Sequence, residues 1–191
     1  VKVKIAEDGE ILVSGENVMN GYWNDPDATS KTLIDGWVHT GDIGEFDDED
    51  YLKITDRKKD ILVNAGGDNI SPTRVEAKLD IEPEIAQSML YGDFKNYLVA
   101  VIVPDKDFAI NWAKENSKDQ VLETIVKNED FYKVMKEVVN KVNKNLSVIE
   151  QVRKFILIDQ EFTIENSMMT VSMKVRRFAV KDKYADELEK L

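Results

Sequence analysis

The stretch of residues 54–72 restricts the fold of this chain more than any other part of the sequence. It contains a dense charge cluster, Asp56–Asp60, which we expect to stay in water. The apolar run Ile61–Val63 follows, and its β-branched residues predict a short buried strand. The next segment, Ala65–Asn69, is a glycine-containing loop that lets another molecule approach the backbone closely. A ligand site beside a moving boundary has this pattern, and so does an ordinary strand–loop–helix connection.

A helix should begin directly after this loop. Ser71 is a favourable N-cap and Pro72 suits the first helical position. The chain changes character here, because the residues before the charge cluster are mostly β-forming and those after it mix helices with strands. We therefore predict two domains, residues 1–58 and residues 59–191.

The first domain is predicted to consist mainly of hairpins. We expect paired strands at 1–5 and 11–13, a short helix at 25–33, a strand at 37–40 that ends in a turn at Gly41-Asp42, and a second hairpin from 43–46 and 51–55.

The second domain is predicted to be α+β, with a central antiparallel sheet flanked by helices. We expect strands at 88–92, 97–103 and 155–158, and helices after Pro72 and at 84–87, 106–116, 121–127, 128–146 and 175–191. An extended segment or loop should cover 168–174. The apolar stripe of the helix at 128–146 favours burial in the core over a partner surface.

Composition excludes several classes of site and partner. The 191 residues contain no cysteine, which excludes disulfides and zinc–thiolate sites, and His39 is the one histidine. No apolar run approaches the ~20 residues needed to span a bilayer. The net charge of −11 argues against nucleic-acid binding. Basic islands within so acidic a chain are the places where an anionic ligand would bind.

Three charged residues are candidates for binding such a ligand. Asp42 could accept two hydrogen bonds from a vicinal diol such as a ribose, although a turn Asp is common. Arg57 offers a planar fork of donors suited to phosphate. Lys174 follows an extended apolar segment and would place a mobile point charge on a polyphosphate, unless it is simply a surface lysine before a helix.

Four motifs, in this order and spacing, resemble the adenylate-forming (AMP-binding) superfamily, and within it the long-chain fatty acid–CoA ligases. The motifs are Gly36–Glu45, Tyr51–Asp60, Val63–Pro72 and Met169–Arg177, and the resemblance covers essentially the whole chain. It implies that residues 1–58 are the β-rich end of a large N-terminal adenylation domain and that residues 59–191 form a mobile C-terminal domain.

The resemblance also implies an activity. ATP and a fatty acid would give an acyl-adenylate and pyrophosphate, and the thiol of CoA would then displace AMP after the C-terminal domain rotates. Residue by residue, it implies that Asp42 holds the ribose hydroxyls and that Arg57 contacts the nucleotide. Lys174 would act catalytically in adenylation.

The remaining matches concern the second step. Lys59 would be the hinge, and Gly66 and Gly67 would line the tunnel for the pantetheine arm of CoA. The expected substrates and cofactors are fatty acid, ATP, CoA and Mg²⁺. The Mg²⁺ ligands are expected upstream of Val1, with no metal ligand in this chain, so the fragment should be inactive without the N-terminal domain of the same protein.

One departure concerns the lysine loop, where Val171 and Ser172 stand in place of the family's usual Pro and Thr. Two alternatives remain. One is another adenylate former, such as a fatty-acyl-AMP ligase, a peptide-synthetase adenylation domain or an aryl-CoA ligase. The other is a non-catalytic regulatory module. We expect a cytoplasmic protein; its lipophilic substrate leaves room for peripheral membrane contact, although no basic amphipathic helix requires it.

Overall fold

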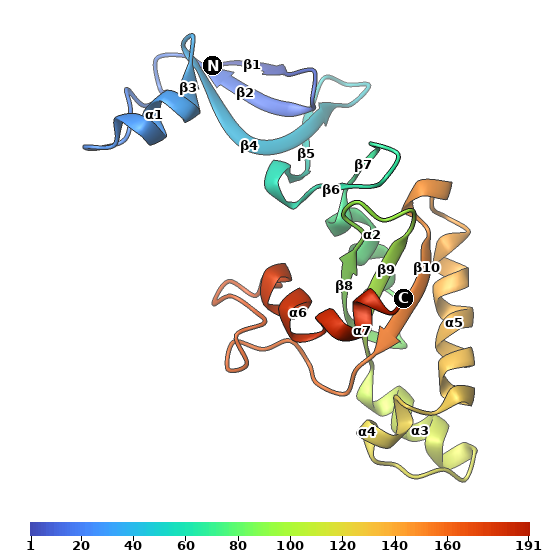
Figure 1. Ribbon diagram of the computed structural model, residues 1–191. Helices are drawn as coiled ribbons and strands as arrows, with labels where there is room; N and C mark the ends of the chain where they lie inside the picture. The colour runs from blue at the N-terminus through green and yellow to red at the C-terminus, as the bar shows by residue number, and fades with distance from the viewer. The chain divides into compact units, whose positions relative to one another are not determined.

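The computed structural model describes residues 1–191. The chain divides into two units, unit 1 with residues 1–61 and unit 2 with residues 62–191 (Figure 1). Each unit combines strands and helices, which confirms the α+β class. The predicted domain limit between residues 58 and 59 lies close to this division and stays a prediction about which parts move independently.

Unit 1 is built around a five-stranded sheet. Its strands lie in the order β1-β2-β4-β3, and β5 pairs with the far part of β4. The bounds are β1 Lys2–Ile5, β2 Glu10–Ser14, β3 Leu33–Ile34, β4 Trp37–Phe46 and β5 Leu52–Arg57, with one helix, α1 Pro26–Thr32. Asp25 caps this helix as predicted, because its carboxylate accepts a hydrogen bond from the Ala28 backbone nitrogen at 2.9 Å.

The predicted end of the third strand at Gly41-Asp42 is wrong. β4 continues without interruption to Phe46. Its register with β2 shifts between Glu10 and Leu12, which is a β-bulge, and Gly41 takes a φ of +72° there. A bulge bends a strand without ending it, so Asp42 remains in the sheet and pairs with a residue of β5.

Unit 2 contains a three-stranded sheet with β9 in the centre. The strands are β8 Ile85–Tyr91, β9 Leu98–Pro104 and β10 Val152–Leu157. The expected antiparallel pairing holds for β8 with β9, but β10 runs parallel to β9. The reason is the long helical connection between β9 and β10, which carries the chain back to its starting end as parallel pairing requires. The short helix predicted at 84–87 is wrong, because residue 84 lies in a turn and β8 begins at Ile85.

Helices supply the rest of unit 2. They are α2 Pro72–Leu79, α3 Lys106–Glu115, α4 Leu122–Ile125, α5 Glu129–Asn143, α6 Arg177–Lys183 and α7 Ala185–Glu189, and a two-stranded ribbon is formed by β6 Leu62–Val63 and β7 Asn69–Ile70. Short 3-10 helices occur at Lys58–Asp60 (η1) and Val148–Glu150 (η2). The single helix predicted at 175–191 is divided, because Tyr184 has a non-helical conformation between α6 and α7.

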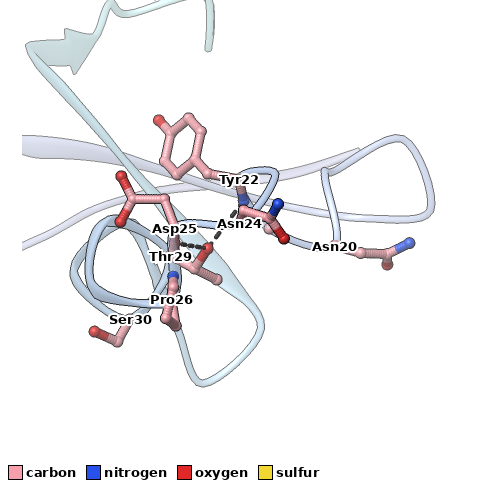
Figure 2. A pocket seen from close by; sticks show the side chains of 8 residues that line it. Asn20, Tyr22, Asn24, Asp25, Pro26, Thr29 and Ser30 are labelled. Carbon is pink, nitrogen blue, oxygen red and sulfur yellow. Dashed lines mark hydrogen bonds between the residues drawn. The ribbon is translucent and has the colours of Figure 1, made fainter.

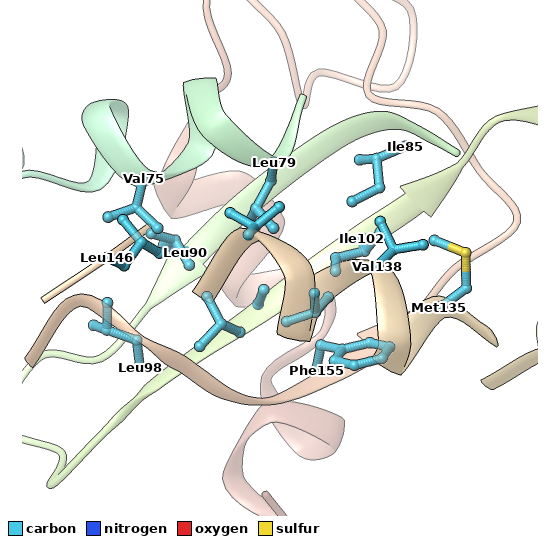
Figure 3. Packing of buried hydrophobic residues seen from close by; sticks show 14 of the residues in the cluster. Val75, Leu79, Ile85, Leu90, Leu98, Ile102, Met135, Val138, Leu146 and Phe155 are labelled. Atoms are coloured by element: carbon cyan, nitrogen blue, oxygen red, sulfur yellow. The ribbon is translucent and has the colours of Figure 1, made fainter. Parts of the chain in front are cut away.

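The core of unit 2 lies on both faces of its sheet. All residues of β9 are buried, which explains the uninterrupted apolar run in the sequence. On one face Leu98 and Ile102 pack with α2 and α5, as Figure 3 shows. On the other face Val99 and Val101 belong to a cluster that includes Val180 of α6. The predicted core stripe of α5 is thereby confirmed.

Candidate functional site

The two predicted nucleotide-binding residues lie side by side on the sheet of unit 1. Asp42 of β4 and Arg57 of β5 are direct partners in the strand register. The Oδ1 atom of Asp42 lies 2.7 Å from Nη1 of Arg57. The Arg57 side chain is half exposed, so this ion pair presents a carboxylate and a guanidinium on the surface of the unit.

A buried carboxylate, Glu10 of β2, supports this part of the sheet. Its Oε1 atom accepts a hydrogen bond from the Gly41 backbone nitrogen at 2.9 Å. Its Oε2 atom lies 2.8 Å from Nδ1 of His39 and 3.0 Å from Nζ of Lys58. Glu10 therefore holds the bulge immediately before Asp42 and the residue immediately after Arg57.

These contacts also set the charge state of Glu10. Burial works to raise the pKa of its carboxyl, but the hydrogen bonds with His39, Lys58 and Gly41 outweigh burial and leave the pKa below its ordinary value. Hydrogen bonds to Asp8 and then to Glu10 raise the pKa of Lys58. Glu10 and Lys58 are therefore both charged at neutral pH.

The predicted hinge, Lys59, is the residue after Lys58 in the chain. Lys58 is tied to unit 1 through Glu10 and through Asp8, whose Oδ2 lies 2.7 Å from Nζ. Lys59 is the next residue, and its side chain is exposed within the short η1 helix. The last side-chain anchor in unit 1 and the predicted hinge are therefore adjacent in the chain.

The predicted pantetheine loop joins β6 to β7. Asn64 and Asp68 close its base, since the Asn64 amide donates to Asp68 Oδ2 and the Asp68 backbone nitrogen donates to Asn64 Oδ1, both at 2.9 Å. Gly67 takes a φ of +85° with open space around it. A Cβ on Gly66 would lie 3.2 Å from Asn64 Oδ1. The tip of the loop therefore has no side chains at Gly66 and Gly67, and hydrogen bonds between Asn64 and Asp68 stabilise its base.

Lys174 lies at the end of a second closed loop in unit 2. The backbone nitrogen of Thr170 donates to the Lys174 carbonyl at 2.8 Å, and an isolated bridge joins Met169 to Val175. Lys174 is exposed, and so are Val171 and Met173. The expected loop at 168–174 is confirmed, and it presents a lysine among exposed apolar side chains.

An ion pair connects the segment after this lysine to the helix that follows the glycine loop. The guanidinium of Arg177 binds both carboxylate oxygens of Glu76 on α2. Glu76 is buried and also accepts a hydrogen bond from the Leu90 backbone nitrogen at 2.6 Å. A fork-to-fork pair of this kind fixes geometry as well as adding energy. It fastens the start of α6 to α2 and β8.

The structure thus brings Asp42 and Arg57 into contact within unit 1, whereas Gly66, Gly67 and Lys174 belong to unit 2. In the structure of residues 1–191, the glycine loop (residues 64–68) and the lysine loop (residues 170–174) form no hydrogen bond with each other. Sequence reasoning missed Glu10, because a carboxylate at a hairpin turn carries no local sign that it will be buried.

A hollow of about 430 Å³ lies elsewhere on unit 1, around α1 (Figure 2). The Thr29 hydroxyl shapes it by accepting from the Tyr22 backbone nitrogen at 2.9 Å and donating to the Asp25 carbonyl at 2.7 Å. Polar side chains line it, but none of the predicted site residues does.

Comparison with known sequences identifies relatives over nearly the whole chain. The family model for the AMP-binding enzyme C-terminal domain matches residues 59–191. The long-chain-fatty-acid–CoA ligase FadD15 of Mycobacterium tuberculosis is 36% identical over 189 residues, which are 98% of this chain and 32% of that protein. The long-chain-fatty-acid–CoA ligase 1 of Homo sapiens is 34% identical over 96% of this chain and 27% of its own length. The chain therefore spans about a third or less of these relatives.

Solved structures agree with the fold. The adenylation domain of a carboxylate reductase from Mycobacterium chelonae superimposes with a TM-score of 0.78 at 24% identity, over 99% of this chain and 30% of that one. The corresponding domain from Segniliparus rugosus, in complex with AMP and a co-purified carboxylic acid, gives 0.71 at 26% identity, over 95% and 27%. Family model, relatives and fold agree, and the chain belongs to the AMP-binding, adenylate-forming enzymes and carries their C-terminal domain.

Proposed function

We propose that this chain is the C-terminal part of an ATP-dependent, AMP-forming long-chain fatty acid–CoA ligase. In the first step a fatty-acid carboxylate attacks the α-phosphorus of ATP, and pyrophosphate leaves. In the second step the sulfur of CoA attacks the acyl carbon, and AMP leaves. The names of the relatives support this reaction class, since both are long-chain-fatty-acid–CoA ligases.

The contact between Asp42 and Arg57 is the observation that carries the proposal. A carboxylate can accept hydrogen bonds from both hydroxyls of a ribose, and a guanidinium fork suits a phosphate. Their separation of 2.7 Å fixes the two groups relative to each other before a ligand arrives. A preorganised pair of opposite charge fits a ligand that joins a sugar diol to a phosphate.

Lys174 is proposed to act in adenylation. Negative charge gathers on the α-phosphate as pyrophosphate departs, and a cation placed there stabilises the transition state more than the ground state. Lys174 is exposed on a closed loop, and the neighbouring Val171 and Met173 are exposed apolar residues. Such side chains suit a loop that becomes covered when the reaction is shielded from water.

Gly66 and Gly67 are proposed to serve the second step. A thin pantetheine arm needs close approach to backbone, and the bare tip of the 64–68 loop offers it. This loop and Lys174 belong to one unit, and their roles fall in different steps. A rotation about Lys59 would exchange them at the reacting centre.

The proposal also covers the magnesium ion, the fatty-acid pocket and the relation to the membrane. No cluster of three or more His, Asp or Glu side chains within residues 1–191 could hold a metal ion. We propose that the Mg²⁺ that accompanies ATP has its ligands in the N-terminal domain. The N-terminal domain of the same protein would supply the fatty-acid pocket. None of the helices combines the length and apolar character needed to cross a membrane.

The test separates the two half-reactions in the full-length protein. Adenylation is followed as pyrophosphate release from ATP and palmitate, and thioester formation is started from preformed palmitoyl-AMP and CoA. We expect Lys174→Ala to slow the first by on the order of a hundred- to a thousandfold and to spare the second. Lys136→Ala, an exposed lysine on α5, is the matched control and should behave as wild type.

Two results would contradict the proposal. Adenylation that survives Lys174→Ala would remove the lysine from the reaction. AMP release by the wild type that does not depend on CoA would favour another adenylate former, such as a fatty-acyl-AMP ligase.

A further inference from the structure

Thr170 forms two hydrogen bonds with the backbone of Lys174. Its backbone nitrogen donates to the Lys174 carbonyl at 2.8 Å. Its hydroxyl accepts a hydrogen bond from the Lys174 backbone nitrogen at 3.0 Å. Both polar groups of the Lys174 backbone are therefore held by one residue four positions earlier.

The Thr170 residue also closes the rest of the loop. Its carbonyl accepts from the Met173 backbone nitrogen at 2.9 Å, and its hydroxyl lies 3.1 Å from the Ser172 hydroxyl. Met173 takes a φ of +61°, an uncommon conformation for a residue with a side chain. The contacts to Thr170 hold the chain in this turn, and the turn determines the direction in which Lys174 leaves it.

The closed loop is rooted in the core. Met168 and Met169, which immediately precede Thr170, are buried. The Met168 carbonyl accepts a hydrogen bond from the Arg176 backbone nitrogen at 2.8 Å, so the residues on the two sides of the loop are joined two positions after the lysine. The two hydrogen bonds between Thr170 and the Lys174 backbone therefore link the exposed lysine to a residue that directly follows the buried Met168 and Met169.

We infer that Thr170 is a positioning residue for Lys174, because its hydroxyl and its backbone nitrogen hold the two polar groups of the Lys174 backbone. This inference rests on the proposed function of Lys174. A long lysine side chain on a loose loop samples many positions, and a displacement of about 1 Å at a reacting centre can cost on the order of a hundredfold in rate. The effect of Thr170 should therefore fall on the adenylation rate and pass through Lys174.

The first experiment replaces the hydroxyl without changing the volume. In the full-length protein we expect Thr170→Val to lower kcat for adenylation by on the order of ten- to a hundredfold, with little change in KM for ATP or palmitate. Thioester formation from palmitoyl-AMP should stay close to the wild-type rate. Thr170→Ser keeps the hydroxyl and should restore adenylation.

The chain offers a matched control in the same unit. The Thr163 hydroxyl also accepts a backbone hydrogen bond, from Asn166 at 3.2 Å, but it does not touch the lysine. Thr163→Val removes an equivalent contact and should leave both half-reactions unchanged. A loss of adenylation equal to that of Thr170→Val would assign the effect to general loosening of the unit and would overturn the inference.

A double-mutant cycle tests whether Thr170 acts through Lys174. In a Lys174→Ala background, Thr170→Val should cause no further loss of adenylation. An additional loss of the same size as in the wild type would show that Thr170 acts by another route. If Lys174→Ala itself leaves adenylation intact, the proposed function fails; if it abolishes adenylation while Thr170→Val does not, only the positioning role fails.

Discussion

Asp42 and Arg57 face each other across neighbouring antiparallel strands, with Oδ1 of Asp42 2.7 Å from Nη1 of Arg57. Both side chains reach solvent, and exposed ion pairs contribute only about 0.2–1 kcal/mol to stability. We therefore propose that this pair matters less for stability than for the geometry that it would offer to a nucleotide.

Replacing the carboxylate of this pair should weaken nucleotide binding and leave the fold intact. We expect Asp42→Asn to raise the Kd for ATP by on the order of ten- to a hundredfold, because a hydrogen bond to a charged acceptor is lost. The free energy of unfolding should change by less than about 1 kcal/mol. Lys53→Met, which breaks the 3.3 Å pair with Asp47 on the same hairpin, is the control and should not affect ATP binding. Equal effects of the two variants would contradict the assignment.

Glu10 should make the stability of unit 1 sensitive to acid. The ordinary pKa of its carboxyl is 4.5, and hydrogen bonds lower the value in the folded chain despite burial. The stabilising contribution is therefore complete above about pH 4.5 and is lost as the pH falls through the lower folded pKa. Thermal unfolding followed from pH 7 to pH 3 should show this loss. Glu10→Gln should flatten the profile, whereas Glu45→Gln at an exposed position of β4 should retain it.

The glycine loop should tolerate Gly67→Ala poorly in the second half-reaction. The φ of +85° costs an L-residue about 1–2 kcal/mol, and the added methyl group would stand where the pantetheine arm is proposed to pass. Thioester formation should slow, and adenylation should not. Gly36→Ala is the control, since this residue has a φ of +77° and equally open surroundings in unit 1. If both variants slow thioester formation alike, strain alone explains the effect.

A hinge at Lys59 predicts an unequal effect on the two steps. Proline fixes φ at this position, so Lys59→Pro should restrict rotation and slow thioester formation more than adenylation. Lys59→Ala removes the side chain but leaves the backbone free, and it should preserve the ratio of the two rates. Equal losses in both half-reactions for the proline variant would argue against a hinge.

Local patterns were sufficient for most of the elements. The caps Asp25 and Ser71 begin the helices that they predict, since each side chain accepts a backbone hydrogen bond from three residues ahead. The apolar stripe on α5 predicted the core correctly, because the apolar face of an amphipathic helix usually packs against the protein interior. The glycine loop and the lysine loop were likewise visible, as both consist of residues adjacent in the chain.

Residue patterns along the chain are enough to predict the α+β class, the positions of most elements and, through four motifs, the family. Three features become apparent only in the folded chain: the continuation of β4 through Gly41, the parallel pairing of β10, and the burial of Glu10 among His39, Lys58 and the Gly41 backbone. The difference arises from the distance along the chain over which each interaction acts. Helix caps and apolar periods act between neighbours in the chain, whereas a bulge register, a strand direction and a buried carboxylate depend on partners that only folding brings together.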